Sequence, residues 1–69
     1  MGRSKVFIFG AGNVGNLILP HILEKYDVIA FLDNDKHKQN TMSKGFPVYA
    51  PEFIIDKQYD SIVIATQAG

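Results

Sequence analysis

The chain has 69 residues, with seven basic and seven acidic side chains, so its formal net charge is zero. Balanced charge gives no electrostatic reason to expect binding to nucleic acid or to an anionic membrane surface. The absence of cysteine excludes disulfides, and no apolar run approaches the roughly 20 residues that a membrane-spanning helix needs. We therefore expect a single small cytoplasmic domain over residues 1–69.

The first predicted element is a buried strand that leads into a glycine-rich turn. Residues 6–9 form a continuous apolar run, which is typical of a strand covered on both faces of a parallel sheet. Positions 10–15 are Gly-Ala-Gly-Asn-Val-Gly, and from Asn13 to about Tyr26 the pattern is that of an amphipathic helix. Pro20 falls on the polar face of this helix, where we expect a bend rather than a break.

The glycines have the spacing Gly-x-Gly-x-x-Gly between a strand and a helix, which is the fingerprint of dinucleotide binding. In this pattern Gly10 permits a tight turn, Gly12 lets the backbone approach a pyrophosphate, and Gly15 lets the helix pack closely on the strand. The free N–H groups and the positive end of the helix would then attract phosphate. The alternative is a glycine-rich turn that serves helix–strand packing alone.

A second apolar run, residues 28–32, ends at Asp33, which stands 18 residues after Gly15. An acid at about this distance accepts hydrogen bonds from the ribose hydroxyls of NAD and repels the 2′-phosphate of NADP. The alternative for Asp33 is an Asx-turn after a strand, and Asp35 has the pattern of a turn residue. The basic cluster 36–38 that follows is either a solvated loop or a contact for a ligand phosphate.

The remaining pattern completes an alternating α/β order. Residues 33–43 are polar without a strand pattern, 45–47 indicate a turn, and 48–49 a short strand. Pro51 suits the first position of a helix of about two turns ending at Ile55 or Asp56, and residues 61–66 form the last strand. We expect a three-layer α/β fold with a parallel sheet in the order 3-2-1-4, counting strands 6–9, 28–32, 48–49 and 61–66.

In this order the last strand lies beside the first, so Thr66 and Gln67 would end it opposite the glycine loop, where open α/β sheets bind ligands. A simple strand cap is the alternative for these two residues. The chain stops soon after the fourth strand, and we expect a fragment of a longer protein. The rest of that protein, or a second copy, would then cover the exposed sheet edge.

The sequence predicts neither a catalytic set nor a metal site. There is no Tyr-x-x-x-Lys pair and no Gly-x-Ser-x-Gly elbow. Neither histidine has a second ligand at metal-binding spacing.

The successive segments GAGNVG, IAFLDND, GFPVYAPE and YDSIVIAT resemble a group of Rossmann modules. The chain resembles the nucleotide-binding domain of bacterial nucleotide-sugar dehydratases and epimerases of polysaccharide biosynthesis. It is similar also to the N-terminal domain of sugar-nucleotide acetyltransferases and to the NADH domain of redox-sensing repressors. The acetyltransferase type usually has Gly-His in place of Asn13-Val14, and the winged helix of the repressors is absent from this sequence.

The resemblance implies a set of ligand contacts: phosphate at Gly10, Ala11, Gly12, Asn13 and Val14, ribose or base at Asp33 and Asn34, and ligand proximity at Thr66. The first functional hypothesis is a module that binds NAD(H) or a nucleotide-sugar, within a polysaccharide-biosynthesis enzyme. The second is an NADH-sensing regulatory module. The third is a Rossmann-like scaffold that binds no ligand and serves assembly.

Overall fold

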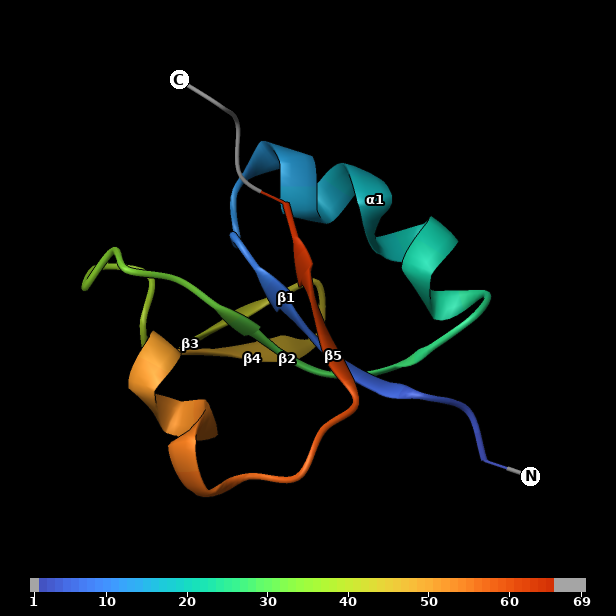
Figure 1. Ribbon diagram of the computed structural model, residues 1–69. Helices are drawn as coiled ribbons and strands as arrows, with labels where there is room; N and C mark the ends of the chain where they lie inside the picture. The colour runs from blue at the N-terminus through green and yellow to red at the C-terminus, as the bar shows by residue number, and fades with distance from the viewer. Residues whose placement is uncertain (1, 66–69) are drawn as a thin grey trace.

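A five-stranded sheet with cover on both faces organises the computed structural model, which describes residues 2–65 (Figure 1). Helix α1 (Asn13–Leu23) lies on one face, and the short 3-10 helix η1 (Pro51–Asp56) lies on the other. The result is the expected three-layer, Rossmann-like α/β fold. The strand order is β3-β4-β2-β1-β5, with bounds β1 Lys5–Phe9, β2 Asp27–Leu32, β3 Thr41–Ser43, β4 Phe46–Tyr49 and β5 Ser61–Ile64.

The four parallel strands β4-β2-β1-β5 have the predicted order, with the last strand beside the first. The sheet also has a strand that the sequence did not predict, because β3 adds an antiparallel edge strand to β4. Lys44 and Gly45 join these two strands with φ of 51° and 86°, the pair of positive values that a tight type I′ hairpin requires. Strand β3 is polar and paired on one side, so its sequence carries no strand pattern.

The core consists of two apolar layers, one on each face of the sheet. Ile8 and Phe31 pack with Leu19 on the α1 face, whereas Phe7 and Leu32 belong to the layer under η1. Consecutive residues of β1 therefore point into different layers, and both layers exclude solvent. This explains why β1 is apolar throughout rather than alternating, and each such buried side chain contributes about 1.5–3 kcal/mol.

Both helices differ in detail from the sequence prediction. Helix α1 contains Pro20 and ends at Leu23, before the expected Tyr26, and beyond its end the Lys25 N–H makes a tighter, 3-10-type bond to the Ile22 carbonyl at 3.0 Å. The helix after Pro51 has the expected span, but it is a 3-10 helix. Its tight hydrogen bonds, such as that from the Phe53 N–H to the Ala50 carbonyl (3.0 Å), are typical of short helical segments.

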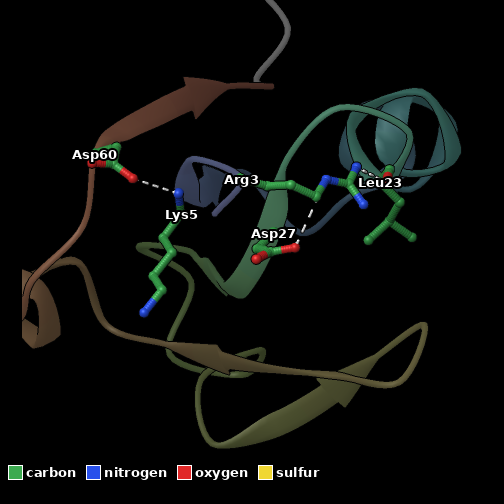
Figure 2. Close-up of polar contacts among 5 residues, drawn as sticks. All are labelled: Arg3, Lys5, Leu23, Asp27 and Asp60. Atoms are coloured by element: carbon green, nitrogen blue, oxygen red, sulfur yellow. Dashed lines mark hydrogen bonds and ion pairs between the residues drawn. The ribbon is translucent and has the colours of Figure 1, made fainter. Parts of the chain in front are cut away.

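The amino end of the sheet is joined by polar contacts near the chain start (Figure 2). The guanidinium of Arg3 donates to the carbonyl of Leu23 at the end of α1, and its Nε lies 3.9 Å from Oδ1 of Asp27 in β2. The backbone N–H of Lys5 donates to Oδ2 of Asp60 at 2.6 Å. These contacts tie β1 to its neighbours at the end of the sheet opposite the glycine turn.

Candidate ligand-binding site

A hollow of about 250 Å³ opens at the carboxyl end of the sheet, where β1 leads into α1. Parallel α/β sheets bind ligands at this end, in the crevice between neighbouring strands whose connections lead to opposite faces. Residues far apart in the sequence meet here, because the carboxyl ends of β1, β2 and β5 lie side by side. The lining residues are Gly10, Gly12, Asn13, Val14, Asp33, Lys38 and Ala65.

The three glycines of the motif have three different local environments. Gly10 has φ of 113° in the turn out of β1, and its N–H donates to the carbonyl of Leu32 at 2.7 Å. A Cβ on Gly15 would lie 2.0 Å from the carbonyl oxygen of Gly10, so the helix could not approach the turn this closely with any other residue. A Cβ on Gly12 would instead project into the hollow, 3.4 Å from Nζ of Lys38. Gly10 and Gly15 thus serve the turn and the packing, and Gly12 keeps the hollow open.

Helix α1 presents an uncapped amino terminus to this hollow. Its N-cap residue is Gly12, no side chain caps it, and its first turn contains no acidic residue. The first helical hydrogen bond runs from the Asn16 N–H to the Gly12 carbonyl at 3.0 Å, so the preceding N–H groups have no helical acceptor. Two residues of this turn, Asn13 and Val14, line the hollow. Uncapped N–H groups and the positive end of the helix dipole favour an anion at this position.

Asp33 ties the end of β2 to the glycine loop. Its Oδ2 accepts from the Ala11 N–H and its Oδ1 accepts from the Asp35 N–H, each at 2.9 Å. The second bond is the Asx-turn that the sequence offered as the alternative for Asp33. Each carboxylate oxygen has a further lone pair, so these two bonds leave capacity for ribose hydroxyls.

The same contacts determine the charge state of Asp33. Burial raises the pKa of its carboxyl, but the N–H groups of Ala11 and Asp35 and the positive charge of Lys38 together outweigh burial, and the net pKa is below the ordinary value of 3.8. Asp33 is therefore ionised at neutral pH and presents a negative charge at one side of the hollow.

The basic cluster after Asp33 separates into one residue at the site and two at the surface. Lys38 lines the hollow, whereas Lys36 and His37 are exposed. The sequence left open whether this cluster contacts a ligand, and the structure distinguishes its members. The sequence feature that pointed to Lys38 was its place in a run of three basic residues shortly after Asp33, the acid that follows β2.

Residues 2–68 match the family model described as C2185-like, N-terminal. The chain belongs to this family. Among solved structures, this family member is similar to the crystal structure of UDP-D-quinovosamine 4-dehydrogenase from Vibrio fischeri, with a TM-score of 0.76 and 26% identity. The match covers 91% of this chain and 57% of the other, so the chain spans little more than half of that protein. No curated protein matches this sequence significantly.

Three of the expected contact residues are not seen in the described part of this structure as free groups that line the hollow. Ala11 lies beside the hollow, but its N–H is already bonded to Asp33 and is not free for a phosphate. Asn34 is exposed and does not line the hollow. Thr66 and Gln67 lie outside the described residues, although the preceding Ala65 lines the hollow and donates its N–H to the Phe9 carbonyl at 2.8 Å.

Residues 2–65 contain neither a metal-ligand cluster nor a helix that could span a membrane. Within these residues, no cluster of histidines and acidic side chains is arranged to hold a metal ion. None of the helices in the same range has the length and apolar character needed to cross a bilayer.

Proposed function

We propose that this chain binds a nucleoside diphosphate, either NAD(H) or a nucleotide-sugar, as a module of a protein of sugar-nucleotide metabolism. The observation that carries the proposal is the hollow in which the uncapped start of α1, the open surface of Gly12 and the ionised Asp33 come together. The arrangement offers N–H donors for a diphosphate and a carboxylate for a ribose. Both candidate ligands carry these two groups.

The position of Asp33 supports a preference among dinucleotides. A carboxylate that accepts hydrogen bonds from ribose hydroxyls is repelled by a 2′-phosphate at the same place. With its pKa below the ordinary value, Asp33 stays charged over the whole physiological range. NADPH therefore binds more weakly than NADH, by about tenfold or more.

The structural neighbour supports the nucleotide-sugar alternative. That protein is named as an enzyme that acts on a UDP-sugar, and its fold matches 91% of this chain. The role we propose for this module is binding, because Asn13, Asp33 and Lys38 give the hollow polar side chains that suit a nucleotide.

Titration calorimetry of the protein with NADH, NADPH and UDP-N-acetylglucosamine tests the proposal. We expect saturable binding of NADH or UDP-N-acetylglucosamine, and weaker binding of NADPH than of NADH if the dinucleotide is the ligand. Asp33→Asn should narrow the difference between NADH and NADPH, whereas Asp35→Asn, an exposed acid of the same loop, should leave it unchanged. Absence of binding for all three compounds would overturn the proposal and favour a ligand-free scaffold.

A further inference from the structure

The ammonium of Lys38 lies over the glycine loop. Its Nζ is the atom nearest to the position that a Cβ on Gly12 would take, at 3.4 Å, and Lys38 lines the same hollow. Gly12 is the residue whose missing side chain lets a pyrophosphate approach the backbone. The charged end of Lys38 is therefore beside the place where the phosphates of a bound nucleotide would lie.

The backbone of the loop holds Lys38 in this place. The Lys38 N–H donates to the Asp35 carbonyl at 3.0 Å, and the hydroxyl of Thr41 donates to the Lys38 carbonyl. The side chain of Gln39 closes the loop by donating to the Asp33 carbonyl at 2.8 Å. Because the backbone is fixed on both sides, the lysine stem starts from a defined position and reaches back over the loop.

Lys38 forms no direct ion pair among residues 2–65, although its charge acts on Asp33 across the same hollow. The ion pairs of the described chain involve Arg3, His21 and Lys57, and none includes Lys38. The acid that lines the hollow with it, Asp33, accepts a backbone N–H on each carboxylate oxygen and makes no direct ion pair with Lys38. The hollow thus combines the positive end of α1 with an ammonium that makes no direct ion pair, and both attract an anion.

We infer that Lys38 forms an ion pair with the diphosphate of the ligand bound against Gly12, and so selects phosphorylated nucleosides over phosphate-free ones. The inference rests on the proposed function and assigns the residue that recognises the phosphate charge. It also assigns which phosphate is recognised. The Lys38 Nζ lies beside the position of a Gly12 Cβ, where the diphosphate approaches the backbone, so it pairs with the diphosphate and not with a 2′-phosphate.

Three variants separate this role from a general charge effect. Lys38→Gln removes the charge and keeps most of the stem, Lys38→Arg keeps the charge, and Lys36→Gln is the matched control on an exposed neighbour. Calorimetry would measure the affinity of each variant for NADH, NADPH, UDP-N-acetylglucosamine and inorganic pyrophosphate, with adenosine and uridine as phosphate-free probes. A thermal melt of each variant reports that it is folded.

We expect Lys38→Gln to weaken binding of the diphosphate ligand by about tenfold or more, and Lys36→Gln to change it by less than about twofold. Lys38→Arg should retain affinity within a few-fold, because the charge is preserved. Raising the salt concentration should weaken binding by the unaltered protein more than binding by Lys38→Gln. Where NADPH binds, its affinity should fall by the same factor as that of NADH.

Each contrary result has a distinct meaning. If Lys38→Gln binds the diphosphate as tightly as Lys36→Gln does, the role of Lys38 is wrong while nucleotide binding stands. If adenosine or uridine binds as tightly as its diphosphate, phosphate recognition by Lys38 is wrong. A loss confined to NADPH would assign Lys38 to the 2′-phosphate and overturn the inference. If the unaltered protein binds none of the diphosphates, the proposed function fails, and the inference fails with it.

Discussion

At each end of β1 an aspartate carboxylate accepts a hydrogen bond from a backbone N–H, but the nearby cations differ in how they are paired. At the amino end, Oδ2 of Asp60 accepts a hydrogen bond from the Lys5 N–H at 2.6 Å (Figure 2). At the carboxyl end, Oδ2 of Asp33 accepts one from the Ala11 N–H at 2.9 Å. In each case an aspartate from a neighbouring segment holds the chain where it enters or leaves β1.

The difference lies in the cations at the two ends. Arg3 at the amino end has a carboxylate partner, Asp27, and a carbonyl acceptor at Leu23 (Figure 2). Lys38 at the carboxyl end makes no direct ion pair among residues 2–65 and lines the hollow at the uncapped start of α1. The Arg3 ion pair therefore serves the fold, whereas an ammonium without a direct ion pair beside open N–H groups is suited to bind an anionic ligand.

The most severe test of the carboxyl end is Gly15→Ala. The new Cβ would overlap the Gly10 carbonyl oxygen, which is backbone and cannot rotate away. We expect a loss of at least about 2–3 kcal/mol in the free energy of unfolding, despite the higher helix propensity of alanine. Chemical denaturation of the protein measures it. Gly12→Ala is the matched control, since its Cβ meets one flexible lysine end at 3.4 Å, and comparable losses in the two variants would contradict this assignment.

The second test separates binding from folding at the same loop. Gly12→Val should abolish binding of the nucleotide and leave the melting temperature nearly unchanged, because the side chain enters the hollow and meets no backbone. Calorimetry and a thermal melt on one preparation measure both effects. Gly2→Val, with no atom near its Cβ, is the control. Unaltered affinity in a folded Gly12→Val protein would show that the loop is not the site.

The third test concerns the Asp33 carboxylate, which holds the glycine loop against the end of β2. Asp33→Asn replaces one acceptor oxygen by an amide group that faces a backbone N–H, so one of the bonds from Ala11 and Asp35 is lost. We expect a loss of about 1–3 kcal/mol in the free energy of unfolding. Asp35→Asn should cost less than about 1 kcal/mol, since its single bond to the exposed His37 N–H needs one oxygen.

The effect of Asp33 should depend on pH in a defined direction. Its folded pKa is lower than the unfolded value near 3.8, so folding favours the ionised form. The stabilisation is therefore fully present above the unfolded pKa and is lost as the pH falls through the folded pKa. Denaturation between pH 7 and pH 3 should show the gap between the unaltered protein and Asp33→Asn narrowing below about pH 4. If the stability difference between the two proteins widened in acid, the pKa of Asp33 would be raised by folding and not lowered.

The sequence predicts the central part of the fold well because burial on both faces leaves a continuous apolar run. Strands β1, β2 and β5 and their order follow from such runs and from the alternation of strand and helix. Strand β3 could not be predicted in this way. It depends on a hairpin in which Lys44, a residue without a glycine's freedom, adopts a positive φ of 51°.

For the site, the sequence identifies the residues whose role depends on local spacing. Gly10, Gly15 and the location of Asp33 at the end of β2 follow from the motif and the strand pattern. The bond from Ala11 to Asp33 and the position of Lys38 depend on contacts across the loop 33–40. Such contacts leave no periodic pattern in the sequence from which they could be predicted. The sequence shows that a basic residue follows Asp33, but only the folded loop shows that Lys38 reaches the glycine turn.

The smallest expected effect tests the amino end. Arg3→Ala removes an ion pair whose two side chains are 45% and 55% exposed, and solvent screens such a pair strongly. We expect a change of less than about 1 kcal/mol in the free energy of unfolding, reduced further by added salt, and no change in nucleotide affinity. Arg3→Lys keeps the charge and should behave like the unaltered protein. A fall in affinity with Arg3→Ala similar to that with Lys38→Gln would mean that net charge, and not the position of Lys38 over Gly12, governs binding, and the contrast between the two ends of β1 would not hold.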